Sequence, residues 1–323
     1  MTERTFLVTG AHGCIGAWVV HELVGRGERV VTLDLSTDPR RIALLLPPEQ
    51  LSAVPHVTGD ISDLGIVEHA IDEHAITNVI HLAALQVPFC RADPPLGARV
   101  NVLGTVNVFE AVRKRLDRMA PVVYASSIAA FDAPEGDAAA ASMHGHPGTI
   151  YGVYKRANEG TAWVYRLESE VPSVGLRPHI VYGVGRDQGL TSAPTTAMLA
   201  AAAGLSFTIP FGGASQLQLA QDVARAFVEA SLSGHDGATV HNLPGPRITM
   251  KEVVDAIATA APESAGSIAF DDVRLPFVEE ADARSFAEIA PGFTTEPLAE
   301  GVRSTIERFR ALLASGRLSP PTS

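Results

Sequence analysis

Short apolar runs alternate with longer stretches of mixed polarity through the first half of the chain. The short runs predict buried strands, and apolar residues that recur every three or four positions predict helices. The expected strands are residues 6–8, 29–33, 56–58, 78–82, 122–125 and 174–180, and the expected helices are residues 17–26, 40–46, 64–73, 96–118 and 150–170. This alternation predicts an α/β fold, a doubly wound parallel sheet of the Rossmann type whose ligands bind at the carboxyl ends of the strands.

The pattern changes after residue 183 and becomes mostly helical. We expect helices at residues 195–203, 220–232, 250–261 and 298–314, and a strand at residues 238–243. Thr249 and Glu252 have the spacing of a capping box at the start of the third of these helices. A second, smaller and mostly helical unit is therefore expected beside the parallel sheet.

A glycine-rich turn connects the first expected strand to the first expected helix. Gly10 permits the tight turn, Gly13 leaves room for a pyrophosphate close to the backbone, and Gly16 lets the helix pack closely on the strand. The start of the helix also offers N–H groups to an anion. Asp34 ends the second strand, where a carboxylate can accept hydrogen bonds from the adenosine ribose and repel the 2′-phosphate of NADP. This context predicts an NAD site.

Charge and composition narrow the kinds of partner. The chain has 323 residues, 46% of them apolar, and a formal net charge of −11, so we expect small-molecule partners and neither nucleic acid nor a membrane surface. Residues 188–221 carry no charge, but prolines and glycines divide them into pieces shorter than the roughly 20 residues of a membrane span. The two cysteines, Cys14 and Cys90, form no disulfide framework. Without a signal peptide in view, a cytoplasmic location is expected, and no metal site is predicted.

Tyr151 and Lys155 lie four residues apart on the expected helix 150–170, so both side chains project from one face. A nearby ammonium group lowers the pKa of a tyrosine from its usual value of about 10, which makes the phenol a general acid or base for a hydroxyl or carbonyl group. Ser126 and Ser127 follow the fifth expected strand, at the edge where a doubly wound sheet places its site. A serine hydroxyl there can bind the substrate oxygen.

These motifs, in this order, resemble the extended short-chain dehydrogenase/reductases, and specifically the NAD-dependent epimerase/dehydratase family. The resemblance extends to about residue 185 and rests on residues 9–16, 34, 60–61, 81–84, 101–105, 126–127, 151–155 and 176–178. It implies that Tyr151 is the acid/base and that Lys155 lowers its pKa and holds the nicotinamide ribose. It also implies that Ser127 orients the substrate oxygen, because the serine of the family precedes an aromatic residue by four positions, here Phe131.

The resemblance implies further contacts. The cofactor would be NAD, bound by Gly10, His12, Gly13, Cys14, Ile15, Gly16, Asp34, Asp60, Ile61, Leu82, Ala83, Ala84, Asn101, Tyr151, Lys155 and Pro178. Asp60 and Ile61 would flank the adenine, and Asn101 would support the site structurally. Substrate contacts are expected from Gln86, Ser127, Tyr151 and His179. The loop residues Phe89, His144, His146 and Gln188 could face the pocket without an assigned role.

The resemblance also implies how the chain is divided and assembled. Residues 1–183 would form the dinucleotide-binding domain, with residues 237–245 returning to its sheet. Residues 184–236 and 246–317 would form the substrate domain, and residues 318–323 a disordered tail. The protein would be a homodimer joined through the long helices 96–118 and 150–170.

Two departures from the family pattern concern the substrate. Members that act on sugar nucleotides commonly carry asparagine where this chain has Ile180, and a basic residue that clamps the diphosphate where it has Ser215. Residues 211–219 are expected to form an uncharged loop. We therefore predict hydride transfer between NAD and the secondary alcohol or ketone of a small non-nucleotide polyol, sugar or hydroxy acid. The alternatives are a sugar epimerase or dehydratase that retains NAD, and a catalytically silent NAD-sensing regulator.

Overall fold

The computed structural model of the chain describes residues 4–130, 147–275 and 278–321. The expectations that involve Phe131, His144 and His146 lie outside these residues. Among the described residues, none of the helices combines the length and the apolar character needed to cross a bilayer.

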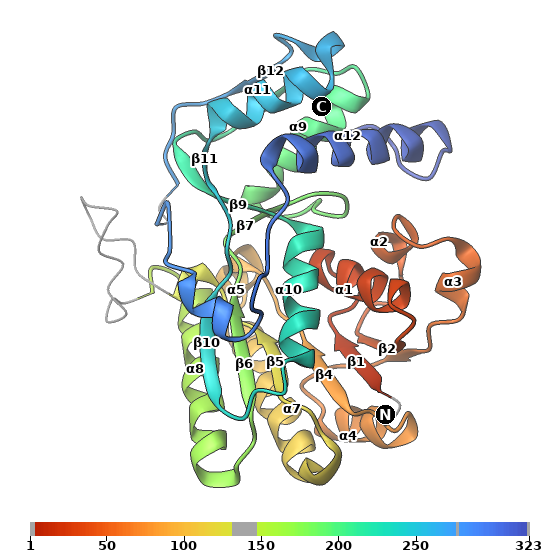
Figure 1. Cartoon of the computed structure of the whole chain (residues 1–323), viewed down its shortest axis with the longest axis vertical. Coiled ribbons are helices and arrows are strands. Elements are labelled where there is room, and N and C mark those ends of the chain that lie inside the picture. The colour runs from red at the N-terminus through yellow and green to blue at the C-terminus, as the bar shows by residue number, and fades with distance from the viewer. Residues whose placement is uncertain (1–3, 131–146, 276–277, 322–323) are drawn as a thin grey trace.

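A seven-stranded sheet forms the centre of the molecule (Figure 1). Its order is β10-β6-β5-β4-β1-β2-β3 and every neighbouring pair is parallel, as the alternating pattern predicted. The strands are β1 (Thr5–Thr9), β2 (Arg29–Asp34), β3 (His56–Thr58), β4 (Asn78–His81), β5 (Val122–Ala125), β6 (Ser173–Arg177) and β10 (Ala238–Asn242). The strand order reverses between β1 and β4, and a doubly wound sheet opens its ligand crevice at the carboxyl ends of such a pair.

Helices cover both faces of this sheet. On one face, α1 (Cys14–Gly25) packs beside α10 (Ala220–Leu232), and on the other lie α4 (Leu64–Glu73), α7 (Gly104–Arg113) and α8 (Ile150–Ser169) (Figure 1). Strand side chains alternate between the two cores: Phe6 and Val8 join the first and Leu7 joins the second. Burial on both faces explains why these strands are continuous apolar runs.

The expected helix 96–118 is interrupted. It consists of α6 (Pro94–Ala98), a π-helical turn over Arg99–Leu103, α7 and a final 3₁₀ turn over Leu116–Arg118, and the short α5 (Val87–Ala92) precedes it. The π turn includes Asn101, whose amide group binds the backbone of Leu85. A tertiary contact thus accompanies the departure from regular α-helix, as is common where a helix carries a functional residue.

The expected strand 174–180 is two strands. β6 ends at Arg177, and β7 (Ile180–Tyr182) belongs to a second sheet of order β11-β9-β7, with β9 (Ala214–Leu219) and β11 (Arg247–Thr249). Pro178 separates them, because proline has no N–H to donate to a ladder. The expectation of a loop over residues 211–219 was wrong, since most of this segment is the buried strand β9.

The remaining elements gather beyond the carboxyl ends of the central strands (Figure 1). They are α9 (Ala193–Ala202), α11 (Met250–Ala260) and α12 (Leu298–Ala314), with the two-stranded sheet of β8 (Phe207–Ile209) and β12 (Ile268–Phe270). The capping box at Thr249 and Glu252 is present as predicted. Two short helices, α2 (Arg40–Ala43) and α3 (Pro48–Ser52), follow β2.

Candidate active site

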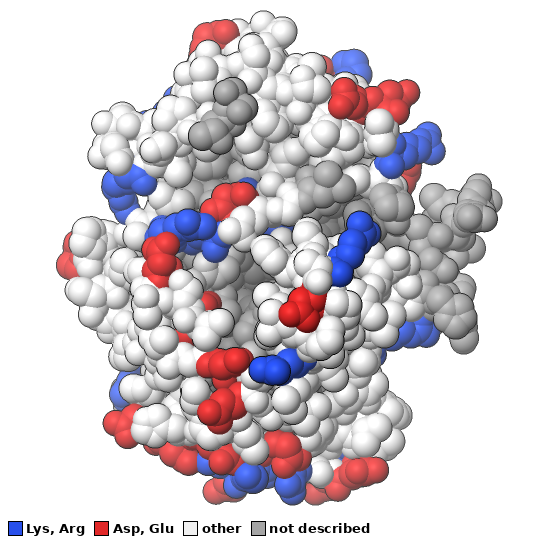
Figure 2. Space-filling model, turned by 180° about the vertical axis from the view of Figure 1, so that it is seen from behind, with Lys and Arg blue, Asp and Glu red and all other residues white. Residues whose placement is uncertain are grey.

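A cavity of about 630 Å³ opens where β1, β2 and β4 end. Figure 2 shows a hollow on this side of the molecule, with both acidic and basic side chains near its rim. The cavity brings together many of the residues expected to bind cofactor or substrate, namely Gly10, His12, Gly13, Cys14, Asp34, Asp60, Ile61, Leu82, Ala83, Ala84 and Gln86. Phe89 and Gln188 also line it.

The glycine turn has the shape that a dinucleotide requires. Gly10 has a φ of +65°, and a Cβ there would lie 2.6 Å from the backbone nitrogen of Ala83. A Cβ on Gly16 would lie 2.3 Å from the carbonyl oxygen of Gly10. A Cβ on Gly13 would meet only that same oxygen, at 3.1 Å, so Gly13 keeps the turn accessible from the cavity. Gly13 also leaves the start of α1 without a side-chain cap, so N–H groups remain there for a pyrophosphate.

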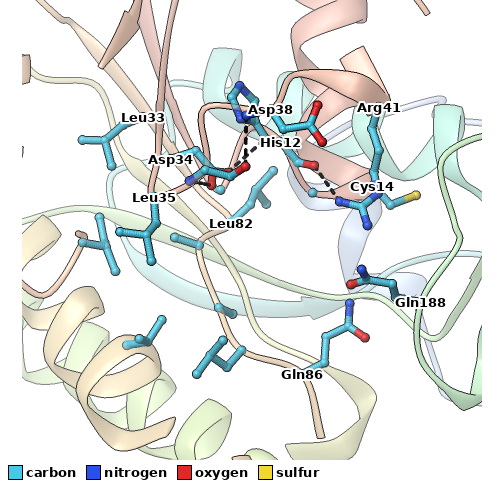
Figure 3. A pocket seen from close by; sticks show the side chains of 18 of the residues that line it. His12, Cys14, Leu33, Asp34, Leu35, Asp38, Arg41, Leu82, Gln86 and Gln188 are labelled. Carbon is cyan, nitrogen blue, oxygen red and sulfur yellow. Dashed lines mark hydrogen bonds between the residues drawn. The ribbon is translucent and has the colours of Figure 1, made fainter. Parts of the chain in front are cut away.

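Asp34 is held at the wall of the cavity by two backbone groups. One carboxylate oxygen accepts from the N–H of His12 at 2.9 Å, and the other accepts from the N–H of Ser36 at 2.9 Å (Figure 3). A carboxylate has about four acceptor positions, so it can still receive two ribose hydroxyls. The arrangement fits the adenosine ribose of NAD.

Three residues at this end of the site, His56, Arg41 and Asp187, carried no recognisable sequence signal, whereas His12 was expected to bind the cofactor. The rings of His12 and His56 stack, with centroids 4.6 Å apart. Arg41 donates to the carbonyl oxygen of His12 at 2.9 Å and to the carboxylate of Asp187 at 2.6 Å. Asp187 follows β7, whereas Arg41 lies on α2, so this pair joins segments that lie far apart in the sequence.

The structure places Ser127, Tyr151 and Lys155 together. The Ser127 hydroxyl hydrogen-bonds the Tyr151 phenol, and Lys155 donates to the carbonyl oxygen of Ala125 at 2.7 Å. The Lys155 ammonium lies 5.6 Å from the centre of the Tyr151 ring. A Cβ at Gly152 would lie 2.0 Å from the carbonyl oxygen of Ala129, so only glycine lets α8 approach the serine segment this closely.

The electrostatics of Tyr151 differ from the expectation. Burial raises the pKa of Tyr151 to about 12, while the Ser127 hydrogen bond and the positive charge of Arg186 act to lower it. Burial lowers the pKa of Lys155 to about 8. The expected lowering of the Tyr151 pKa by Lys155 is therefore not found in the chain by itself, because burial disfavours the charged form of both groups.

Ser126 has a different partner from Ser127. Its hydroxyl donates to the carboxylate of Glu159, which also receives two hydrogen bonds from Arg177, at 2.7 and 2.6 Å. Ser126 is thus part of a buried ion-pair network, and Ser127 is the serine that meets Tyr151. The geometry favours the same serine as the family resemblance.

The other expected site residues, like Ser127, Tyr151 and Lys155, do not line the cavity and have contacts within the chain. Asn101 accepts from the N–H of Leu85 at 2.7 Å and donates to its carbonyl oxygen at 3.0 Å, which fixes the segment after β4. The carbonyl oxygen of Pro178 accepts from the N–H of Ile128 at 3.1 Å. Ile15 and Gly16 belong to the first turn of α1.

His179 has contacts through both its backbone and its ring. Its ring donates to the carbonyl oxygen of Val278 at 2.6 Å, and its N–H donates to Gln218 at 2.8 Å. Burial lowers the pKa of its imidazole to about 4, so the ring is neutral at pH 7. Its role as a substrate contact stays a prediction.

The fold and the cavity define a dinucleotide-binding enzyme of the short-chain dehydrogenase/reductase type. Residues 6–242 match the model of the NAD dependent epimerase/dehydratase family, and the chain belongs to this family. It is accordingly an NAD-dependent enzyme of the extended type.

Among curated relatives, a UDP-glucose 4-epimerase of Mycolicibacterium smegmatis is 30% identical over 318 residues, which cover 94% of this chain and 98% of the relative. A D-erythronate dehydrogenase of Cupriavidus necator is 29% identical over 271 residues, or 79% of this chain and 81% of the relative. Among solved structures, the UDP-glucose 4-epimerase of Thermus thermophilus in complex with NAD has a TM-score of 0.77 at 29% identity, covering 95% of this chain and 99% of that one. The chain is therefore similar to both epimerases and dehydrogenases.

Proposed function

We propose that the protein is an NAD-dependent dehydrogenase that acts on a secondary alcohol, or the corresponding ketone, of a small non-nucleotide polyol, sugar or hydroxy acid. The observation that carries this proposal is the hydrogen-bonded pair of Ser127 and Tyr151, on a substrate side where the buried positions 180 and 215 are neutral. NAD supplies the hydride acceptor. Ser127 would hold the substrate oxygen while Tyr151 takes the hydroxyl proton, and the carbinol hydrogen leaves with its electron pair. In the reverse direction, the Tyr151 phenol gives its proton to the ketone oxygen.

The case against a nucleotide sugar rests on the interior of the substrate side. Ile180 and Ser215 are both buried and uncharged. Gln216 donates to the carbonyl oxygens of Gly245 and Ala281, at 3.1 and 3.2 Å, and Gln218 donates to that of Leu243 at 2.8 Å. These amide donors are therefore engaged within the chain. A diphosphate placed among these neutral side chains would lose its hydration without compensation, unless Arg186 or Arg247 supplied a cation from elsewhere.

A sugar epimerase that retains NAD is the second candidate. It is supported by the 30% identity to the UDP-glucose 4-epimerase over nearly the whole chain. The D-erythronate dehydrogenase has similar identity over a shorter length and supports the first candidate. A silent regulator is set aside, because the family and the relatives are enzymes.

A substrate screen separates the two candidates. Purified protein with added NAD should produce NADH, read by its absorbance, from at least one member of a panel of polyols, aldoses and sugar acids. Calorimetry with UDP-glucose and UDP-galactose on NAD-loaded protein runs in parallel. Micromolar binding of either nucleotide sugar, with conversion of one into the other and no net NADH, would contradict the proposed dehydrogenase and support the epimerase.

We also propose that the enzyme is a homodimer assembled through α8 and the helical segment that ends in α7. Exposed apolar side chains on these elements support it: Leu96, Leu103, Val153, Trp163, Val164 and Leu167, the last 64% exposed. Apolar patches of this kind mark interfaces. Sedimentation at micromolar concentration should give a dimer, and a double change of Trp163 and Leu167 to Glu should give a folded monomer. A monomeric unmodified protein would contradict this.

The proposed partner is a small molecule, and the net charge of −11 disfavours nucleic acid. Both cysteines, Cys14 and Cys90, are free. Free thiols support a location in the reducing cytoplasm.

A further inference from the structure

Arg186 is a cation of the cavity wall that has no acidic partner in residues 4–130, 147–275 and 278–321. It follows β7, and its backbone N–H donates to the carbonyl oxygen of Gly183 at 3.1 Å. One terminal nitrogen of its guanidinium donates to the Thr191 hydroxyl at 2.9 Å. Its Nε is buried and has no hydrogen-bond partner. The side chain is therefore anchored at one point and unsatisfied at another.

The other two arginines that line the cavity, Arg40 and Arg41, are both paired with Asp187. Arg41 binds the carboxylate of Asp187 at 2.6 Å, and Arg247 binds that of Glu279 through two nitrogens. A partly buried charge without a counter-ion is costly, whereas an anion that accepts from a guanidinium recovers that cost. The contrast indicates that the counter-ion of Arg186 comes from a bound molecule.

The place of Arg186 identifies the part of the bound molecule that it meets. The guanidinium lies on the cavity wall beside Gln86, and its positive charge acts on both Tyr151 and Cys14. In a nucleotide sugar, the sugar ring separates the diphosphate from the reacting carbon. In a small hydroxy acid, the carboxylate lies only one or two carbons away from the reacting hydroxyl.

The side-chain amide of Gln86, which could bind the hydroxyls of a small hydroxy acid, lies beside Arg186. The side-chain carbonyl oxygen of Gln86 and an Arg186 terminal nitrogen lie 2.8 and 3.7 Å from the point where a Cβ of Gly189 would be. Gly189 has a φ of +86°, so glycine is required there for its backbone shape as well as for space. Figure 3 shows Gln86 and Gln188 pointing toward each other at this end of the cavity. Amides placed in this way can bind the hydroxyls of a polyol chain.

We infer that Arg186 forms the anion subsite of the substrate pocket and that the substrate is a hydroxy acid, with its carboxylate on Arg186 and its reacting hydroxyl at Ser127 and Tyr151. This inference rests on the proposed dehydrogenase function. It narrows that function from polyols, sugars and acids to small carboxylates such as aldonates.

Acid and alcohol pairs test the inference on the unmodified enzyme. NADH production is measured with glycerate, erythronate, threonate and gluconate, and with the matched alditols glycerol, erythritol, threitol and glucitol. At least one acid should be oxidised with a kcat/KM well above that of its alditol. If alditols are oxidised as readily as acids, the inference is wrong and the dehydrogenase stands. If no acid is bound or oxidised, the inference is also overturned; if UDP-glucose is then epimerised, the proposed function fails with it.

Variants assign the effect to Arg186. Arg186→Gln should lower kcat/KM for the acid by about tenfold to a hundredfold, mainly through KM, because a charge-assisted hydrogen bond is lost. Arg186→Lys should retain part of the activity, and the control Arg247→Gln should match the unmodified enzyme. Because Arg186 also acts on Cys14 in the glycine turn, NAD affinity is measured for each variant. A loss of NAD affinity with unchanged preference for the acid would show that Arg186 binds the pyrophosphate, which overturns the inference.

Discussion

The two ends of the cavity differ in how their polar groups are satisfied. At the adenosine end, Asp34 accepts from two backbone N–H groups, and Arg41 is bound to Asp187 and to the backbone of His12. The reaction end comprises Arg186 on the cavity wall and the catalytic candidates Ser127, Tyr151 and Lys155, which do not line the cavity themselves. Here the Arg186 Nε lacks a partner, and burial raises the pKa of Tyr151 to about 12. The charged groups of the adenosine end, Asp34 and Arg41, have partners within the chain, although the buried Nδ1 of His12 has none. The Arg186 guanidinium has no counter-ion among the described residues. This difference suits a cofactor site that is fixed in shape and a catalytic site whose polar groups are kept for the reacting molecule.

The largest effect is expected from removing the phenol at the reaction end. Tyr151→Phe keeps the ring, and turnover should fall by about 10²- to 10⁴-fold, the usual loss for a general acid or base. NAD affinity, measured by titration, should barely change. Tyr154→Phe is the control on the same helix, since the Tyr154 hydroxyl donates to Pro94 instead. Near-normal turnover by the Tyr151 variant would make Tyr151 a packing residue.

At the adenosine end, the charge of Asp34 should set the choice of cofactor. Asp34→Asn keeps an oxygen acceptor but removes the negative charge, so the preference for NAD over NADP should narrow by about tenfold. Asp38→Asn removes the charge of another acid that lines the cavity, and it should leave the ratio of NAD affinity to NADP affinity unaltered. Titration of both cofactors measures this. Equal or tighter binding of NADP to the unmodified protein would contradict the role of Asp34.

Ser127 should affect how kcat/KM for alcohol oxidation depends on pH. Its hydrogen bond lowers the pKa of Tyr151, so Ser127→Ala raises that pKa further. Alcohol oxidation needs the deprotonated phenol, and the rise of kcat/KM with pH should therefore move to higher pH. Ser126→Ala, which loses a bond to Glu159, should keep the original profile. An unshifted profile for the Ser127 variant would limit this residue to substrate contact.

The smallest effect concerns the ion pair across the adenosine end. Asp187→Asn removes the charge that Arg41 binds, and exposed ion pairs contribute about 0.2–1 kcal/mol, so NAD release should accelerate by up to about fivefold. Asp236→Asn removes a comparable exposed pair far from the cavity and should leave release unchanged. Stopped-flow displacement of NADH measures both rates. Identical rates in the two variants would show that the pair does not retain the cofactor.

Most of the central sheet was predictable from the sequence, because its strands are short apolar runs and its helices have one apolar stripe. The same is true of Gly10, Asp34 and the spacing of Tyr151 and Lys155, whose meaning depends on neighbours within a few residues or on one strand end. The burial of individual side chains was not predictable from such local patterns. The Tyr151 pKa was expected to fall and instead rises, since the desolvation of a phenol depends on the whole fold around it.

The amino-acid sequence by itself determined the parallel sheet, the dinucleotide turn and the candidate catalytic residues, because each is encoded in local periodicity or short spacing. Only the tertiary structure decided the π turn at Asn101 and the burial of the neutral strand β9. It also decided that Arg41 has a carboxylate partner while Arg186 has none among the described residues. Such pairings join segments that are distant along the chain, so no local pattern of residues can encode them.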